Sequence, residues 1–268
     1  MENKEKVKDF WNTASCGEEL YLKGFELDDY LYQSKIRYEL EPEILSFGNF
    51  NTLLNIKVLE IGVGLGSDHQ KIAEAGAILS GIDLTERAIN HTRRRFDFLG
   101  LSSELHQGDA ENVSFESETF DVVYSWGVIH HSPNTERAID EIYRILKPNG
   151  IARIMIYHKY SIIGFMLWVK FGLLKFRPFI SLKELYDKYL ESPGTKAYSY
   201  DEALTLFKKF KIRTMTSPLT HGDLLISSAG QRHKGLLLTI ARKLWPRWII
   251  KKMFKNSGLY LMIEMEKK

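Results

Sequence analysis

The sequence predicts an α/β fold built around a parallel β-sheet. Between residues 56 and 157, short apolar runs alternate with helical patterns. This alternation is typical of βαβ units, in which a helix connects two parallel strands. A second observation is a run of alternating glycines, Gly62, Gly64 and Gly66, directly after one apolar run. A glycine turn that joins a strand to a helix lets a ligand approach the backbone and the helix N-terminus.

The central part of the chain is expected to contain five strands and three helices. We expect the strands at 57–61, 77–82, 103–108, 120–125 and 150–157. The helices are expected at 67–75, 85–98 and 135–146. Thr85 is suited to cap the second of these helices, and Gly100 is suited to end it.

The flanking segments are expected to be helical at first and to add two strands later. Residues 1–55 contain amphipathic helical patterns at 2–11 and 27–40, and Glu41-Pro42 is typical of another helix start. After residue 157, Ser199 and Glu202 form a capping box for a helix that is expected to reach Phe210. Strands are expected at 211–216 and 259–264. The chain is thus divided into 1–55, 56–157 and 158–268.

Two long stretches, about 158–198 and about 217–257, have no place in this alternation. Connections of this length in a compact domain are usually functional or carry helices of their own. We expect them to form a lid over the ligand site together with the N-terminal helices. The apolar stretch 162–174 is expected to be the roof of the acceptor pocket.

Composition limits the classes of protein that the chain can belong to. The 268 residues carry a formal net charge of only +3, which does not demand a nucleic-acid partner. Cys16 is the single cysteine, so an intrachain disulfide is excluded. The charged N-terminus does not resemble a secretory signal, and the longest apolar candidate, 160–174, is interrupted by Lys170. A cytoplasmic location is therefore expected.

Several motifs together resemble those of the class I S-adenosylmethionine (SAM) methyltransferases. Their order and spacing match over roughly residues 55–158. The matching segments are 58–67 with Glu60 before the glycines, Asp83, 108–110, 120–125, 128–134 and 142–150. The chain is most similar to the small-molecule group that includes quinone C-methyltransferases and sugar O-methyltransferases. This resemblance implies a Rossmann-like, seven-stranded, mostly parallel sheet with helices on both faces, an antiparallel edge hairpin and a helical lid.

The resemblance also implies a SAM site at the carboxyl ends of the strands. The backbone of Gly62, Gly64 and Gly66 would lie along the methionine part, and Glu60 would face its ammonium group. Asp83 would hold the ribose hydroxyls, because a carboxylate at a strand tip can accept two hydrogen bonds. The adenine end and the neighbouring strand would contribute the remaining cofactor-binding residues, which are Leu84, Asp109, Ala110 and Ser125.

Two adjacent histidines, His130 and His131, closely follow the fourth strand and are the candidate catalytic residues. An imidazole can remove the proton of an attacking hydroxyl or amine near neutral pH. A structural role is the alternative. Related sugar O-methyltransferases often place an acid at the end of the fifth strand to support such a histidine, but this chain has Tyr157 and His158 there. No third ligand is spaced to join the histidines, so a metal site is not expected.

Other residues admit a functional and a plain structural interpretation. Arg37 could reach the SAM carboxylate, but a surface ion pair with Glu41 is the preferred interpretation. Tyr21, Tyr30, Tyr32 and Tyr38 could close over the site, or pack within their helices. The basic aromatic segment Arg232–Lys255 contains no acid. It could contact an anionic membrane surface, or equally a phosphorylated or nucleic-acid substrate, although a lid helix with solvated lysines is favoured.

The motif series favours a SAM-dependent methyltransferase that acts on a small, apolar or lipid-linked acceptor by direct methyl transfer. An RNA or protein methyltransferase is the first alternative. A SAM-binding regulatory protein without turnover is the second. The acceptor atom, whether oxygen, nitrogen or carbon, is left open.

Overall fold

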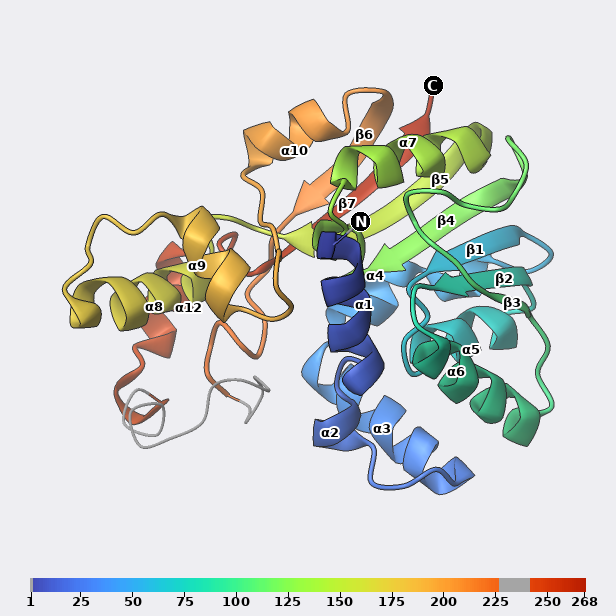
Figure 1. Cartoon of the computed structure of the whole chain (residues 1–268), viewed down its shortest axis with the longest axis horizontal. Coiled ribbons are helices and arrows are strands. Elements are labelled where there is room, and N and C mark those ends of the chain that lie inside the picture. The colour runs from blue at the N-terminus through green and yellow to red at the C-terminus, as the bar shows by residue number, and fades with distance from the viewer. Residues whose placement is uncertain (1, 227–241) are drawn as a thin grey trace.

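A computed structural model describes residues 2–226 and 242–268, in which seven strands form one sheet with helices on both faces (Figure 1). The strands lie in the order β3-β2-β1-β4-β5-β7-β6. The first five are parallel, and β7 is antiparallel to both of its neighbours. The predicted fold class and its antiparallel edge hairpin are confirmed. The strands are β1 (Lys57–Ile61), β2 (Ile78–Asp83), β3 (Glu104–Gln107), β4 (Phe120–Trp126), β5 (Leu146–Tyr157), β6 (Phe210–Thr216) and β7 (Tyr260–Lys267).

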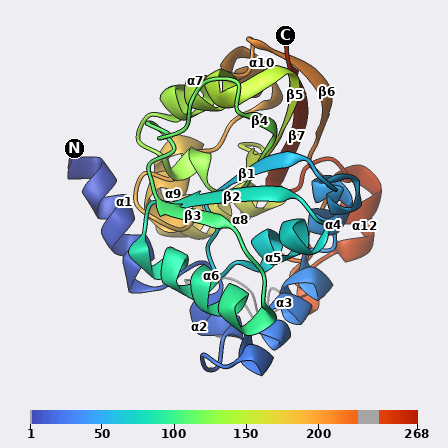
Figure 2. The same ribbon diagram turned by 90° about the vertical axis from the view of Figure 1, so that its right-hand side faces the viewer.

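Helices cover the two faces of the sheet and create two hydrophobic cores. One face packs against α7 (Thr135–Ile145) and α10 (Tyr200–Leu206), and the other against α4 (Glu43–Gly48), α5 (Ser67–Glu74) and α6 (Glu86–Leu99) (Figure 2). Because both faces are covered, four of the five residues of β1 are buried. This double coverage explains why the strands appear in the sequence as continuous apolar runs instead of alternating patterns.

The predicted helix ends agree closely with the structure because local hydrogen bonds define them. Thr85 accepts a hydrogen bond from the backbone of Ala88, and Gly100 ends α6 in a left-handed conformation with φ +63°. Ser199 and Glu202 form the predicted capping box. The helix that follows ends at Leu206, however, and not at Phe210. Phe210 is needed as the first, buried residue of β6.

Strand β5 begins four residues earlier than the sequence predicts. Leu146 pairs with Phe120, but the regular pairing with β4 resumes only at Ile151. The residues between them form an irregularity that includes Asn149 with φ +61°. Proline, asparagine and glycine at 148–150 are typical of a turn, so the pattern alone concealed this extension of the strand.

The N-terminal segment lies along one side of the sheet core. It contains α1 (Glu2–Thr13), α2 (Glu18–Tyr21), α3 (Leu27–Leu40) and a short 3₁₀ turn, η1 (Phe50–Thr52). In Figure 1 the first of these helices crosses the region where the parallel strands end. Arg95 of α6 links α3 to the core through hydrogen bonds. Its buried guanidinium donates to Ser34 and Gln33 in α3 and to Gln70 in α5.

A separate group of helices lies beyond the carboxyl end of β5. It consists of α8 (Ile162–Leu167), the π turn η3 (Trp168–Gly172), the 3₁₀ turn η4 (Leu173–Lys175), α9 (Leu182–Tyr189) and α12 (Arg247–Met253) (Figure 1). A small core of Ile162, Leu224 and Ile250 joins α8 to α12. Within the described residues, none of the helices is both long and apolar enough to cross a membrane.

Replacing the buried cation Arg95 is expected to lower the stability of the fold. Arg95→Met leaves the acceptors of Ser34, Gln33 and Gln70 without their charged donor, which should reduce the free energy of unfolding by about 3 kcal/mol. Urea denaturation followed by circular dichroism measures the change. Arg94→Met, at an exposed position of the same helix, should change stability by no more than about 0.5 kcal/mol. Equal effects of the two variants would contradict the role given to Arg95.

Candidate active site

A cavity opens at the carboxyl ends of the parallel strands, between the sheet and the N-terminal helices. It lies where the strand order reverses between β1 and β4, which is the usual ligand position in an open α/β sheet. Its walls include predicted cofactor-binding residues and residues of the N-terminal segment. These are Glu60, Gly62, Gly64, Asp83, Leu84, Asp109 and Ala110 in the first group, and Lys4, Val7, Trp11, Ser15, Cys16, Gln33, Arg37 and Glu41 in the second.

Gly62 and Gly64 of the glycine turn have positive φ angles, which larger residues rarely adopt. The turn leaves room for a ligand at the second of them. Gly62 has φ +86°, and a Cβ atom there would lie 2.1 Å from a methyl group of Val128. Gly64 has φ +53°, and no atom lies within 4 Å of where its Cβ would be. The backbone at Gly64 is therefore open to the cavity. Gly66 is the N-cap residue directly before α5 and does not line the cavity.

Asp83 lies at the end of β2 with its carboxylate held in one orientation. One oxygen accepts from the backbone N–H and the hydroxyl of Thr85, at 2.9 and 2.8 Å. The other accepts a longer hydrogen bond of 3.2 Å from the backbone N–H of Gly64. Burial raises the pKa of Asp83, and these three hydrogen bonds oppose that shift. One lone-pair position on the Gly64-side oxygen remains for a ligand hydroxyl.

Glu60 takes part in a buried chain of hydrogen bonds behind the glycine turn. Its carboxyl group lies 2.8 Å from Nδ1 of His69, whose Nε2 lies 2.7 Å from the hydroxyl of Ser103. That hydroxyl donates to the carbonyl of Leu79, so it accepts from Nε2–H. Burial lowers the pKa of His69 to about 3, so the ring is neutral and Nδ1 carries no proton. Burial and the nearby Asp68 raise the pKa of Glu60, and the protonated carboxyl group donates to His69.

The adenine end of the predicted site is closed by helix α1. Asp109 accepts from the backbone of Glu111 at 2.9 Å. Lys4 of α1 donates to Asp109 and to Glu111, both at 2.6 Å. Leu84 and Ala110 line the cavity beside this ion pair. The structure therefore brings together the residues that the sequence assigned to ribose and adenine, and adds a lysine that the sequence analysis did not consider.

The sequence analysis missed Asp68, the most connected carboxylate of the site. It lies in the first turn of α5 and is buried. It accepts from Nη2 of Arg37 at 2.9 Å and from the hydroxyls of Tyr38 and Tyr124, both at 3.0 Å. Arg37 also contacts Glu41 at 3.3 Å, so the predicted ion pair is present. The prediction that this ion pair lies on the surface was wrong, because Arg37 is mostly buried and lines the cavity.

The two candidate histidines have different surroundings. His131 lines the cavity, and Trp11 of α1 packs edge-on against its ring. His130 is fully buried outside the cavity, between His131 and Tyr157 at centroid distances of 4.1 and 4.0 Å. Both histidines belong to the 3₁₀ turn η2 (Ile129–His131), and only the side chain of His131 reaches the cavity. We therefore keep only His131 as the candidate base and assign His130 a packing role.

His131 is held by residues of the segment that follows α9. Its Nδ1 lies 2.9 Å from the hydroxyl of Ser192 and 3.1 Å from that of Thr195. Thr195 donates its own proton to the carbonyl of Ser192, so its oxygen is an acceptor for Nδ1–H. In the tautomer that donates from Nδ1 to Thr195, the lone pair lies on Nε2. Nε2 forms no hydrogen bond with a described residue.

A carboxylate from the same segment faces this nitrogen. Oε2 of Glu191 lies 3.4 Å from Nε2 of His131 and accepts a hydrogen bond of 2.7 Å from the hydroxyl of Tyr157. Glu191 belongs to the 158–198 insertion and does not lie at the end of the fifth strand. No spacing rule identifies it in the sequence, because Glu191 is 60 residues from His131 and meets it only in the folded chain.

The remaining sequence predictions have mixed outcomes. Ser125 is fully buried and does not line the cavity. His158 donates to the carbonyl of Gly258 and is also remote from the cavity. The four N-terminal tyrosines do not line it either, which favours their packing role. The prediction that 162–174 forms the pocket roof was wrong. That stretch packs toward Leu224 and Ile250, and it exposes Phe165, Leu173 and Leu174.

The part of the cavity beside His131 is aromatic. Trp11, Trp126, Tyr157 and Tyr260 contribute to its wall together with Met155. The rings of Trp126 and Tyr260 lie 5.5 Å apart in an edge-on arrangement. Across residues 2–226 and 242–268, no cluster of three potential metal ligands is present. The geometry is that of an apolar pocket with one histidine–carboxylate pair at its border.

Comparison with known proteins agrees with this geometry. Residues 59–154 match the family model described as "Methyltransferase domain". A sterol 4-C-methyltransferase of Caenorhabditis elegans is 33% identical over 98 residues, which are 36% of this chain and 29% of that protein. A fatty-acid O-methyltransferase of Mycolicibacterium smegmatis is 35% identical over 96 residues, 35% of this chain and 34% of that protein. The chain thus spans about a quarter to a third of the length of such curated relatives.

Solved structures share the fold over most of the chain. A SAM-dependent methyltransferase from Aquifex aeolicus has a TM-score of 0.55 at 13% identity, covering 91% of this chain and 100% of the other. The [4+2]-cyclase SpnF has a TM-score of 0.53 at 14% identity, covering 88% and 81%. The fold alone therefore does not define the reaction.

Residues 59–154 match a methyltransferase domain, and the chain shares its fold with a SAM-dependent methyltransferase of known structure.

The buried His130 is expected to make stability depend on pH. Burial, followed by the neighbouring His131 and Lys196, lowers its pKa well below the ordinary 6.5. The unfolded chain therefore binds a proton below pH 6.5 that the folded chain does not, and stability falls as the pH falls. His130→Phe should reduce the slope of unfolding free energy by about 1.4 kcal/mol per pH unit below pH 6.5.

Urea denaturation between pH 7 and pH 5 measures this slope. His106→Phe, which changes an exposed histidine, should leave it close to that of the unmodified protein. An unchanged slope in His130→Phe would contradict a neutral, buried His130.

Proposed function

We propose that this protein is a SAM-dependent methyltransferase that acts on a small, apolar or lipid-linked acceptor bearing a hydroxyl or amine. The observation that carries the proposal is that one cavity contains both halves of such a site. The open backbone at Gly64 and the oriented carboxylate of Asp83 lie on one side. His131, whose Nε2 faces Glu191 and forms no hydrogen bond with a described residue, lies on the other.

In this proposal the protein does little covalent chemistry. The sulfonium of SAM supplies a reactive methyl group, and the enzyme aligns the acceptor and excludes water. Asp83 accepts from a ribose hydroxyl at its one remaining lone-pair position, Asp109 and Leu84 lie at the adenine, and the glycine backbone follows the methionine part. Lys4 and the rest of the N-terminal segment act as the lid. Asp68 and Glu60 offer a polar wall for the ammonium group.

His131 is proposed as the general base. Its Nε2 takes the proton of the acceptor hydroxyl or amine while the methyl group is transferred. The imidazolium that forms then lies 3.4 Å from the carboxylate of Glu191, which stabilises its charge. Tyr157 keeps that carboxylate in place through its hydrogen bond. An acceptor that is already nucleophilic, such as an activated carbon, needs no such base.

The apolar acceptor class rests on the aromatic wall and on the relatives. Proteins similar over the central part of the chain include sterol, fatty-acid and phthiotriol methyltransferases, by their names. A peripheral membrane contact through the basic aromatic segment Arg232–Lys255 belongs to the same proposal, although residues 232–241 lie outside the described part. We also propose a cytoplasmic location and no nucleic-acid partner.

The direct test is a methyl-transfer screen with labelled SAM across sterols, fatty acids, amines, RNA and proteins. Product mass identifies the acceptor. Transfer to an apolar small molecule supports the proposal, whereas transfer only to RNA or protein would replace it. SAM binding without any turnover would favour a regulatory protein.

Loss of the ribose carboxylate should weaken cofactor binding. Asp83→Ala is expected to cost about 1–3 kcal/mol of SAM affinity, because a ribose hydroxyl loses its charged acceptor. Titration calorimetry measures the dissociation constant, and a thermal melt checks that the variant is folded. Asp97→Ala, at an exposed position of α6, should bind SAM normally. Unchanged SAM affinity in the folded Asp83→Ala variant would show that the cofactor binds elsewhere.

Replacing His131 and replacing Glu191 should lower the rate to different extents. His131→Ala is expected to lower kcat about 10²–10⁴-fold with little change in SAM affinity. Glu191→Gln should also lower kcat, but less, because the imidazolium that forms then lacks the charged carboxylate beside it. Glu184→Gln, on the outer side of α9, should leave kcat and SAM affinity unchanged. An unchanged kcat in Glu191→Gln would mean that Glu191 has only a structural role.

A further inference from the structure

Two stretches of this chain concentrate its positive charge. Residues 160–183 contain Lys170, Lys175, Arg177 and Lys183, and residues 224–263 contain eight lysines and arginines, with no acid in either stretch. Together they carry twelve positive charges in a chain of net charge +3, so the remaining residues carry a net charge of −9. Such separation of charge marks a surface for an anionic partner.

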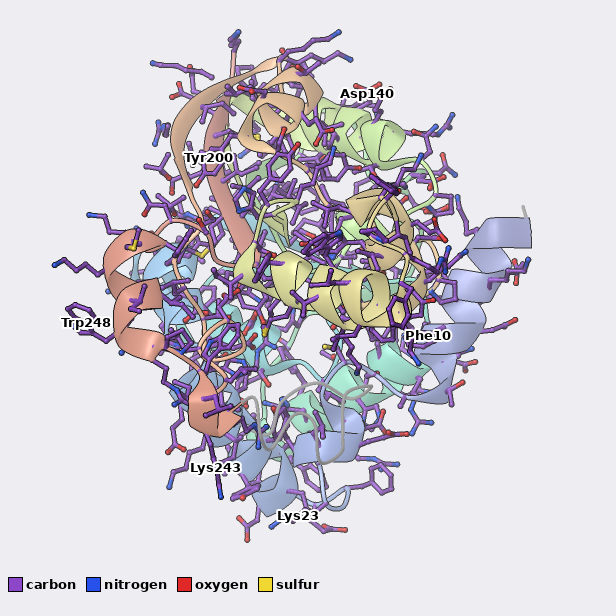
Figure 3. All side chains as sticks on the ribbon, turned by 90° about the vertical axis from the view of Figure 1, so that its left-hand side faces the viewer. Phe10, Lys23, Asp140, Tyr200, Lys243 and Trp248 are labelled. Carbon is purple, nitrogen blue, oxygen red and sulfur yellow. The ribbon has the colours of Figure 1, made fainter. Side chains whose placement is uncertain are left out.

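The fold brings the described parts of the two stretches together. Ile162 of α8 and Ile250 of α12 meet in the small core with Leu224. Figure 3 looks onto this helical group, with α12 beside α8 and with Trp248 and Lys243 directed outward. Stretches that are more than 60 residues apart in the sequence therefore form one surface, which we call the basic aromatic face. Its described members are 165–179 and 243–255.

The basic aromatic face exposes large apolar side chains between its lysines. Phe176 and Phe179 are 94% and 99% exposed, more than any other large apolar residue among those described. They flank Arg177 and Pro178, and Lys175 precedes them. On α12, Trp248 and Met253 are 72% and 70% exposed. An exposed apolar surface of this size usually marks an interaction site.

Local structure maintains the exposure of the tip at Phe176. This residue ends η4 in a left-handed conformation with φ +56°, which is unfavourable for an aromatic residue. The backbone N–H of Arg177 is held by the carbonyl of Gly172 at 2.8 Å, and Trp168 donates to the carbonyl of Pro178 at 3.0 Å. The tip is therefore a defined turn that presents two phenyl rings.

The lysines of the face are available for an external partner. Within the described part of the chain, no acid forms an ion pair with Lys175, Lys183, Lys243, Lys251, Lys252 or Lys255. Arg177 contacts Glu184 at 3.2 Å, and this is an exposed pair of little energetic value.

We propose that the basic aromatic face docks on the surface of an anionic lipid bilayer, with Phe176 and Phe179 inserted among the headgroups. Lysines attract anionic headgroups while aromatic and aliphatic side chains enter the interface, which is the pattern of peripheral membrane binding. A second copy of this chain fits poorly, because a symmetric contact would bring two acid-free basic surfaces together. A nucleic acid fits less well, because Leu173, Leu174 and Met253 add exposed aliphatic surface that base stacking does not use and that a bilayer interface does.

This docking concerns a surface outside the cavity and requires no turnover. Helix α9 connects the two regions, since its N-terminal part follows the tip and its C-terminal end leads to Glu191 in the cavity wall. A bilayer-bound protein would therefore hold the acceptor end of its cavity close to a source of apolar molecules.

Vesicle binding of the full chain, without SAM or acceptor, tests the proposal. The probes are vesicles of phosphatidylcholine alone and of phosphatidylcholine mixed with phosphatidylglycerol, each in co-sedimentation at low and high salt. We expect binding only to the anionic vesicles and weaker binding at high salt. Equal binding to both vesicle types, or no binding, would overturn the proposal.

Paired variants separate the two contributions. Phe176→Ser/Phe179→Ser should weaken partitioning at least about 10-fold. Lys251→Glu/Lys252→Glu should weaken it about 25-fold or more, since each lysine near an anionic surface contributes about fivefold. Phe98→Ser/Leu204→Ser and Lys208→Glu/Lys209→Glu make the same kinds of change at exposed positions elsewhere and should bind like the unmodified protein.

Three further results would contradict a bilayer partner. Variants of the face that bind as well as their controls would show that another surface is used. A dimer that dissociates on Phe176→Ser/Phe179→Ser in sedimentation analysis would identify a second copy as the occupant. Tighter binding to single-stranded RNA than to anionic vesicles would identify a nucleic acid. Because none of these measurements involves methyl transfer, their failure and failure of the proposed activity are distinguishable.

Discussion

The buried carboxylate of Asp68 holds the site together. A charge in the interior is costly unless it is paired and hydrogen-bonded, and Asp68 is paired with Arg37 and also accepts from two tyrosine hydroxyls. These partners belong to α3 and β4, while Asp68 itself begins α5. The same guanidinium contacts Glu41, which accepts from Tyr260 of β7. One carboxylate thus fixes the N-terminal helices over the carboxyl edge of the sheet.

The position of Asp68 also determines the charge of the cavity wall. Arg37 is committed to Asp68 and Glu41, and the negative charge of Asp68 adds to the effect of burial on Glu60. Glu60 is therefore protonated and makes a neutral hydrogen bond to His69. Burial alone would lower the pKa of Arg37, but Asp68 and Glu41 raise it above its usual range. The wall is polar beside the glycine turn and aromatic beside His131, which divides the cavity into two chemically different halves.

The sequence predicts those features that depend on residues close together in the chain. The strands, the glycine turn, the cap at Thr85 and the tip of β2 at Asp83 all follow from local patterns. Features that depend on distant contacts were missed. Arg37 meets Asp68 across 31 residues, and His131 meets Glu191 across 60. The sequence pattern also does not distinguish His130 from His131 as the candidate base, because the geometry of the turn decides which ring faces the cavity.

The first part of the insertion at 158–198, residues 160–183, illustrates why an apolar stretch without acids is ambiguous. Its composition suits a pocket roof and an interfacial surface equally, since both require apolar side chains and neither requires carboxylates. The structure separates the two roles along the chain. Leu173 and Phe176 point to solvent, whereas Ser192 and Thr195 hold the ring of His131. A single insertion therefore forms part of the exterior at its beginning and part of the cavity wall at its end.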